Sequence, residues 1–188
     1  KDSQFMEMAL FASVIFSDEE MQLSSVKAVD NSYPLIGSLE LENSGGVYST
    51  KSNPKPGTVW MDERLQNLLK VNYGDKVYIG DTSFLFTDTI KYEPDRASGN
   101  FSFAPKTIMN MSDLESTQII QPGSRVEYNY LFAGPENEII YIRNFLEGIK
   151  ESGDEIEMLD EDSSSLGRAV DRSENFFLLG GLIAVLLS

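Results

Sequence analysis

The chain has 188 residues, with 15 Lys and Arg against 30 Asp and Glu, which gives a formal net charge of −15. This charge repels the phosphates that nucleic-acid-binding proteins neutralise with basic side chains, so we expect no nucleic-acid partner. Histidine and cysteine are both absent, which excludes imidazole and thiol catalysis and the two commonest zinc ligands. The length fits one large domain or two small ones.

The first third of the chain reads as strands. Residues 9–30 place β-branched and aromatic residues on both sides of an acidic stretch at 18–20, which predicts a hairpin. Turn-forming residues at 31–34 follow, and residues 35–41 predict a short strand. Residues 42–57 are rich in Gly, Ser, Asn and Pro and predict an exposed loop.

A strand and a short helix are predicted next, and then a second hairpin. Residues 58–61 form the strand, and Asp62 caps a helix whose apolar face holds three leucines. These leucines are Leu65, Leu68 and Leu69. Gly74 is placed to end the helix in the left-handed conformation. Residues 76–90 predict two strands joined by the pair Gly80 and Asp81, which suits a two-residue turn.

Residues 93–132 predict an irregular turn at 93–100, a strand at 101–103, a short helix near 112–113 and a strand at 125–132. In the last strand polar and apolar residues alternate, which indicates that one face is buried. Residues 135–152 predict an amphipathic helix, ended by Gly153 and followed by a returning strand at 155–159. The apolar face of that helix holds Ile139, Ile142, Phe145, Leu146 and Ile149.

Residues 151–162 carry seven carboxylates in twelve positions. Such a cluster suits either a calcium site or a solvated face. Because the segment lacks the alternating ligand order and the loop glycine of a calcium loop, the pattern favours a solvated face.

The chain ends in an uncharged run from Phe176 to Leu187. It suits a buried terminal helix, a core strand, or the first part of a membrane span, since a full span needs about 20 apolar residues. Residues 163–165 offer a helix start. A helix that is polar in its first half and wholly apolar afterwards favours a stalk that enters a membrane.

The sequence predicts no catalytic, cofactor-binding or metal-binding residue and no enzyme activity. The carboxylate pairs Glu19/Glu20 and Asp62/Glu63 are sequence neighbours, so their side chains diverge and cannot flank one substrate bond. The chain has no phosphate-binding glycine loop and no G-x-S-x-G nucleophile motif.

Four motifs occur in a fixed order: "EPD" at 93–95, "F-x-x-A-P" at 101–105, "MN-x-x-D-L" at 109–114 and "QPGSR" at 121–125. In this combination the chain resembles the FtsX-like ABC transporter permeases. The branch it resembles most is that of the YbbP-type permeases of predicted lysophospholipase L1 biosynthesis transport systems. The resemblance covers nearly the whole chain.

The resemblance implies an α+β fold of the MacB-like periplasmic core type, in two lobes. A porter-like α/β lobe would comprise residues 1–34, truncated at their N-terminal side, and residues 123–162. Residues 35–122 would form an inserted, mostly β lobe, and residues 163–188 a stalk helix that runs into a transmembrane segment.

The resemblance also implies a function. The domain would face the periplasm at the bacterial inner membrane and transmit motion from a separate cytoplasmic ATPase subunit. Its substrates would be membrane lipid or acylated molecules, with a periplasmic thioesterase or lysophospholipase as a partner. The alternative is a non-transporting scaffold that regulates an extracytoplasmic enzyme. A groove lined by Phe84, Phe86, Phe101 and Phe103 would favour lipid handling, although these side chains also suit a core.

Overall fold

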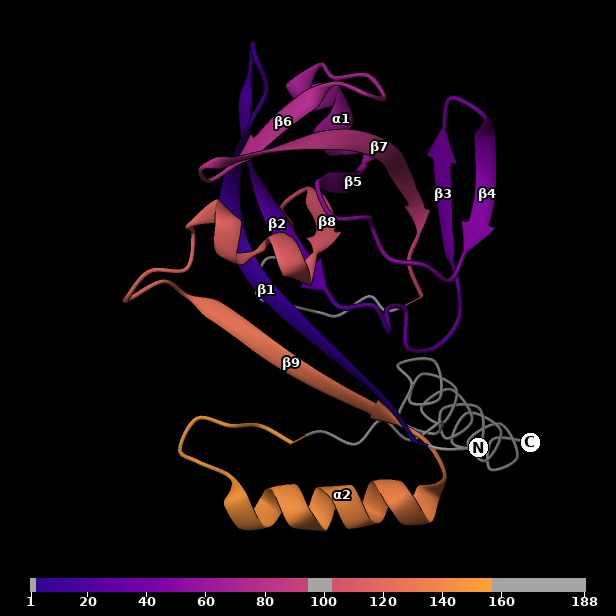
Figure 1. The fold of residues 1–188 in the computed structure, drawn as a ribbon, viewed down its shortest axis with the longest axis vertical. Helices are drawn as coiled ribbons and strands as arrows, with labels where there is room; N and C mark the ends of the chain where they lie inside the picture. The colour runs from indigo at the N-terminus through magenta and orange to yellow at the C-terminus, as the bar shows by residue number, and fades with distance from the viewer. Residues whose placement is uncertain (1–2, 95–102, 157–188) are drawn as a thin grey trace, which may run out of the picture. The chain divides into compact units, whose positions relative to one another are not determined.

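The structure is a computed structural model that describes residues 3–94 and 103–156. The chain divides into two compact units, residues 1–139 and residues 140–188. The first unit contains the nine strands of the described residues (Figure 1). Most of the longest described helix, α2 (Glu136–Ile149), belongs to the second unit.

The strands belong to one mixed sheet, and most neighbouring strands in it are antiparallel. Only the pairs β2–β8 and β5–β7 are parallel among the described strands. The strands are β1 (Gln4–Phe16), β2 (Met21–Val29), β3 (Leu39–Asn43), β4 (Gly46–Thr50), β5 (Thr58–Asp62), β6 (Lys76–Ile79), β7 (Thr82–Tyr92), β8 (Lys106–Asn110) and β9 (Val126–Ala133). Together with the helices they give the α+β class that the sequence predicts.

Part of the sheet closes on itself. The strand order is β4-β3-β7-β5-β8-β2-β1-β6, and β6 also pairs with β7. The strands β7, β5, β8, β2, β1 and β6 therefore form a closed ring, which leaves no free edge within it. β3 and β4 extend from β7, and β9 pairs with the first half of β1.

A single core cluster takes alternate residues from the ring strands, as expected where one face of each strand points inward. It includes Ile15, Ile79 and Phe86, each with no exposed surface. The helix α1 (Glu63–Leu69) adds Leu65 and Leu69 to the same cluster. This shared core makes the ring and α1 one packed body.

A second core cluster lies on the other face of the strands. The segment between β2 and β3 contributes Tyr33, which is fully buried, follows a turn at residues 31–32 and precedes the cis peptide bond to Pro34. Trp60 of β5 and Ile108 of β8 pack in the same cluster. The sheet is thus covered on both faces near the start of β3.

Several predicted elements are confirmed. The hairpin at 9–30 is β1 and β2, although β1 begins earlier than expected, at Gln4. The strand at 58–61, the helix capped by Asp62 and the hairpin turning at Gly80 are all present. Gly74 has a positive φ, but Lys70 already ends α1 with φ 55°.

Other predictions are wrong. The strand predicted at 35–41 begins only at Leu39, because residues 34–37 form bends. Residues 42–57 are not a continuous loop, because Gly46–Thr50 pairs with β3 as β4. Its side chains are mostly exposed, so backbone pairing rather than burial holds this strand.

β8 is not among the strands predicted from the sequence. Phe103 lies in a turn, and residues 101–102 are outside the described residues. β8 instead lies between β2 and β5, and four of its five residues are buried. A strand covered on both faces shows no polar–apolar alternation. The helix predicted near 112–113 is a pair of 3-10 turns, Met111–Asp113 and Glu115–Thr117.

The remaining elements agree in position but not in burial. β9 matches the strand predicted at 125–132, yet Tyr128 is 46% and Tyr130 57% exposed, so the expected buried face is not found. α2 matches the predicted amphipathic helix, and none of its described side chains is fully buried. Glu155 and Ile156 are irregular, and the rest of the strand predicted at 155–159, with the stalk at 163–188, lies outside the described residues.

Residues 3–94 and 103–156 contain no helix that is both long and apolar enough to cross a membrane.

Candidate functional site

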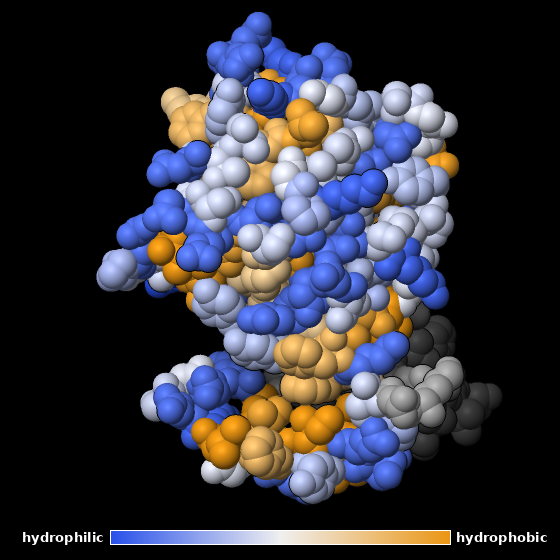
Figure 2. All heavy atoms as spheres, in the orientation of Figure 1, coloured by the Kyte–Doolittle hydropathy of each residue, from blue (hydrophilic) through white to orange (hydrophobic). Residues whose placement is uncertain are grey.

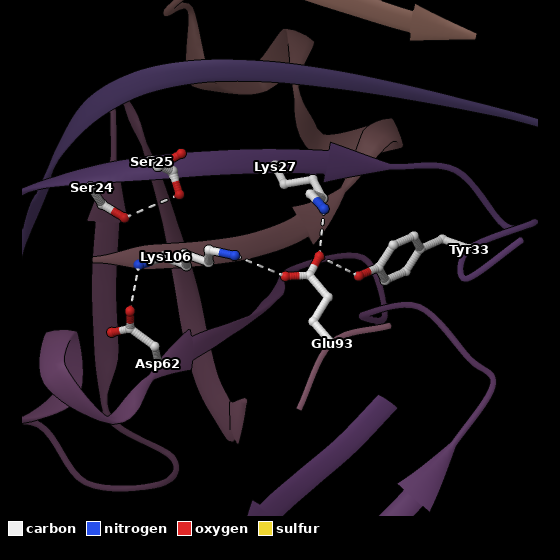
Figure 3. A network of polar contacts seen from close by, with 7 residues as sticks. All are labelled: Ser24, Ser25, Lys27, Tyr33, Asp62, Glu93 and Lys106. Atoms are coloured by element: carbon white, nitrogen blue, oxygen red, sulfur yellow. Dashed lines mark hydrogen bonds and ion pairs between the residues drawn. The ribbon is translucent and has the colours of Figure 1, made fainter. Parts of the chain in front are cut away.

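A buried carboxylate, Glu93, is the centre of the main polar cluster inside the first unit (Figure 3). One oxygen, Oε1, accepts a hydrogen bond from the Lys27 ammonium and one of 2.8 Å from the Tyr33 hydroxyl. The other oxygen, Oε2, lies 3.3 Å from the Lys106 ammonium. Side chains of β2, of the segment after it and of β8 therefore meet at the Glu93 carboxylate, which follows β7.

The electrostatics of this cluster keep Glu93 ionised. Burial would raise the pKa of Glu93, but the positive charge and hydrogen bond of Lys27 outweigh it, together with Lys106 and the Tyr33 hydroxyl. The net pKa lies below its usual value of 4.5. The Lys27 ammonium also lies 5.7 Å from the centroid of the Tyr33 ring, a cation–π arrangement.

Backbone contacts connect this cluster to the adjacent strands. The Asp62 carboxylate accepts hydrogen bonds from the backbone N–H of Lys106 at 2.8 Å and of Leu65 at 2.7 Å. It therefore caps α1 and holds the start of β8 at the same time. The Ser24 hydroxyl bonds the carbonyl of Pro105 at 2.9 Å. These contacts fix the segment that follows residue 102 to β2 and β5.

The motifs that carry the family resemblance supply these contacts and others like them. The "EPD" motif contributes Glu93, and the "F-x-x-A-P" motif contributes the Pro105 carbonyl. In "MN-x-x-D-L" the Asn110 side chain donates to the Pro54 carbonyl, and Asp113 accepts from the Gly57 N–H, both at 2.8 Å.

The "QPGSR" motif forms a turn in the same way. The Ser124 hydroxyl donates to the Ile119 carbonyl and accepts from the Gln121 N–H, both at 2.9 Å. Gly123 takes a φ of 93°, which suits glycine. Each of the four motifs therefore contributes at least one residue whose hydrogen bonds hold a turn or join two segments of the described chain.

The arrangement around Glu93 does not suit acid–base catalysis. A carboxylate held ionised between two ammonium groups is a poor proton donor, and its oxygens are already used by internal partners. The cluster connects the end of β7 to β2, to β8 and to the segment before β3. We call Glu93, Lys27, Tyr33 and Lys106 together the internal latch. Sequence reasoning missed it because Lys27 and Glu93 are 66 residues apart.

A second polar cluster connects β3 and β4 to β7. Buried Asp88 accepts hydrogen bonds from the Tyr48 hydroxyl at 2.7 Å and from the Asn43 amide at 2.9 Å. Burial and the negative Asp88 raise the pKa of Tyr48 to about 12. The hydroxyl therefore stays protonated near neutral pH and serves as a donor.

The predicted phenylalanine groove is not formed by these side chains. Phe84 is 1% exposed and Phe86 is fully buried, both in the ring core. Phe103 is 91% exposed in a turn, and Phe101 lies outside the described residues. The alternative interpretation, that the phenylalanines belong to the core, is confirmed for Phe84 and Phe86.

Aromatic side chains gather instead on the paired ends of β1 and β9, where Figure 2 shows hydrophobic atoms at the surface. The Phe5 ring stacks on Tyr130 with centroids 6.2 Å apart, and it contacts Phe132 at 5.2 Å. Phe5 is 45% exposed. These rings were not identified as a group from the sequence, because the two strands are far apart in the chain.

The fold is that of a MacB-type periplasmic domain. The crystal structure of the periplasmic region of MacB from Actinobacillus actinomycetemcomitans matches with a TM-score of 0.51. The match covers 76% of this chain and 64% of that chain at 10% sequence identity, so it concerns the fold alone. No protein-family model matches the chain.

The sequence matches an ABC transporter permease. The chain is 34% identical over 178 residues, or 95% of its length, to the uncharacterized ABC transporter permease YbbP of Escherichia coli K12. The predicted resemblance to the FtsX-like permeases is thereby confirmed. The chain spans 21% of the length of YbbP, which is about a fifth of that permease.

Proposed function

We propose that this chain is the extracytoplasmic domain of an ABC transporter permease subunit in the bacterial inner membrane. In this role it transmits motion driven by a cytoplasmic ATPase subunit to the periplasmic side. The observation that carries the proposal is the 34% identity to a permease over 95% of the chain.

The construction of the first unit supports a mechanical role. β1 has 13 residues, so at about 3.3 Å per residue it extends for roughly 40 Å. Its residues 4–11 pair with β9, and its residues 8–16 pair with β2 inside the closed ring, where residues 15 and 16 also pair with β6. A displacement applied to the β9 end is therefore carried into the ring by one continuous strand.

The internal latch supports the same role. Glu93 and its partners join segments by ionic and hydrogen-bond contacts, in addition to strand pairing and to the packing of Tyr33 against the second core cluster. A closed ring with a buried apolar core and a buried ionic cluster deforms little, because protein interiors have low compressibility. A domain of this kind moves as a body, which transmission of force requires.

We further propose that the permease handles lipid or acylated molecules together with a periplasmic thioesterase or lysophospholipase. To test this, the full permease is purified in nanodiscs with and without its ATPase subunit, and bound lipid is identified by mass spectrometry. Enrichment of one lipid class over the nanodisc composition supports lipid handling. A bound composition equal to that of the nanodisc contradicts it.

A second candidate function is a non-transporting scaffold that regulates an extracytoplasmic enzyme. The observation that favours it is the burial of Phe84 and Phe86, because the expected apolar groove would have used both side chains. The two candidates differ in one measurement. Under the scaffold hypothesis, the enzyme partner is activated by the permease without ATP hydrolysis, and lipid is not extracted.

A further inference from the structure

Six exposed apolar side chains share one face of the sheet at the end of the β1–β2 hairpin. Phe16 lies directly opposite Met21 on β2 and opposite Tyr78 on β6. Directly paired residues point to the same face, and so do residues two apart on one strand. We name this set the hairpin-end patch: Val14, Phe16, Met21, Leu23, Tyr78 and Leu85.

The exposure of these side chains is large for their size. Met21 is 68%, Leu23 49% and Phe16 43% exposed, and the other three are 38–42% exposed. The residues between them point inward, since Ile15 and Ile79 have no exposed surface. The ring core is therefore complete without the hairpin-end patch, and its apolar side chains are available to a partner.

Acidic residues border the hairpin-end patch. Asp18 and Glu19 form the turn between Phe16 and Met21, and both are exposed. Asp81 forms the turn between β6 and β7 and is also exposed. Glu20 is already paired with Lys70. Lys76, opposite Leu85, lies on the same face, as do Lys27 and Lys106 farther along, whose ammonium groups are paired with Glu93.

The negative charge of this border indicates which kind of partner can bind the hairpin-end patch. A bilayer with anionic headgroups repels it, and so does a second copy of a chain whose net charge is −15. The uncharged run at 176–187 has no cation to pair with it. A protein segment that presents apolar side chains together with Lys or Arg complements both features.

We propose that the hairpin-end patch is a docking surface for a cationic, amphipathic segment of a protein partner on the extracytoplasmic side. The inference rests on the proposed function for the compartment, since a partner there must reach the domain from outside the membrane. The apolar side chains supply the binding energy, and the acidic border sets the orientation of the segment and its rate of association.

The test uses the 188-residue chain and two synthetic amphipathic helical peptides, one of leucine and lysine and one of leucine and glutamate. Methyl resonances of methionine report the site, because Met21 is exposed whereas Met61 and Met109 are fully buried. The proposal expects saturable binding of the lysine peptide, with a shift of the Met21 methyl group. The buried methionines report that the fold is intact.

Substitutions then assign the binding to the patch. Leu23→Gln and Phe16→Gln should each weaken binding about tenfold, as for central apolar contacts. Ile36→Gln is the matched control, since Ile36 is 71% exposed elsewhere and should change nothing. The double substitution Asp18→Asn with Glu19→Gln should weaken binding and reduce its salt dependence, whereas Glu40→Gln should not.

Three results overturn the proposal. The first is equal binding of the glutamate peptide, and the second is binding that leaves the Met21 methyl group unchanged. The third is that Leu23→Gln abolishes another association instead, either binding of anionic vesicles in preference to the lysine peptide or self-association of the chain. The assay requires neither ATPase nor membrane. Its result can therefore be interpreted even if the proposed transport role is wrong.

Discussion

Tyr33 and Glu93, 60 residues apart, meet in the interior, where the Tyr33 hydroxyl donates a hydrogen bond of 2.8 Å to Glu93 Oε1. This contact joins the segment after β2 to the end of β7. It also adds a hydrogen bond to a carboxylate that is already paired with the Lys27 and Lys106 ammonium groups. The polar cluster around Glu93 therefore joins segments that no local sequence pattern brings together.

The Glu93→Gln substitution should lower the free energy of unfolding by about 3 kcal/mol, since it leaves two ammonium groups facing a neutral amide. Urea denaturation followed by circular dichroism measures this change. Glu40→Gln is the control, because Glu40 is exposed and should lose less than about 0.5 kcal/mol. Equal effects of both substitutions would show that the latch adds nothing to stability.

The contribution of Glu93 should depend on pH. Its pKa in the folded chain lies below the usual 4.5, so the unfolded chain takes up the proton first as the pH falls. The stabilisation is thus complete above about pH 4.5 and declines as the pH falls through the folded-state pKa. The stability difference between the native chain and Glu93→Gln, measured at several pH values, should shrink in acid. A difference that grows in acid would contradict the ion-pair account.

The Asp62→Ala substitution should destabilise the chain by about 2 kcal/mol. It removes the N-cap of α1 and the hydrogen bond to the Lys106 N–H, each of which contributes about 1 kcal/mol. Glu63→Ala, at the neighbouring exposed position, is the matched control and should have little effect. Thermal unfolding measures both. If the two variants unfold at the same temperature, the double role of Asp62 is wrong.

Gly80 should tolerate no side chain. A Cβ atom there would lie 2.0 Å from the Thr117 carbonyl oxygen, and the residue has a φ of 57°. Gly80→Ala should therefore cost more than Gly46→Ala by about 1–3 kcal/mol, because Gly46 also has a positive φ but no atom within 4 Å of the added Cβ. Urea unfolding of the two variants separates steric overlap from backbone strain. Equal losses of stability in the two variants would show that the close contact with the Thr117 carbonyl does not restrict the residue at position 80.

The sequence predicts the elements whose signals are local. The turn at 18–20, the cap at Asp62 and the pair Gly80 and Asp81 each lie within a few residues of the structure that they determine. The four motifs also indicate a resemblance to ABC transporter permeases, which the 34% identity to one such permease over 95% of the chain supports. Local chemistry and resemblance together therefore give the class of fold.

The features that escape prediction depend on contacts between distant segments. β8 has buried residues on both faces, so it lacks the alternation that marks a half-covered strand. Closure of the ring requires β6 to pair with both β1 and β7, which no local pattern encodes. The Glu93 latch likewise combines residues from four segments. The division into lobes at 1–34, 35–122 and 123–162 stays a prediction.

We expect the domain to move as a body when the ATPase works. Because the chain contains no cysteine, Glu19→Cys and Glu40→Cys can be labelled selectively once any cysteines elsewhere in the permease are replaced. Energy transfer is then measured between the two labels, and from each label to a labelled lipid, in nanodiscs that hold the full permease and its ATPase. We expect ATP to change the energy transfer to lipid and to leave the energy transfer between the two labels unchanged. Transfer to lipid that is the same with and without ATP would contradict it.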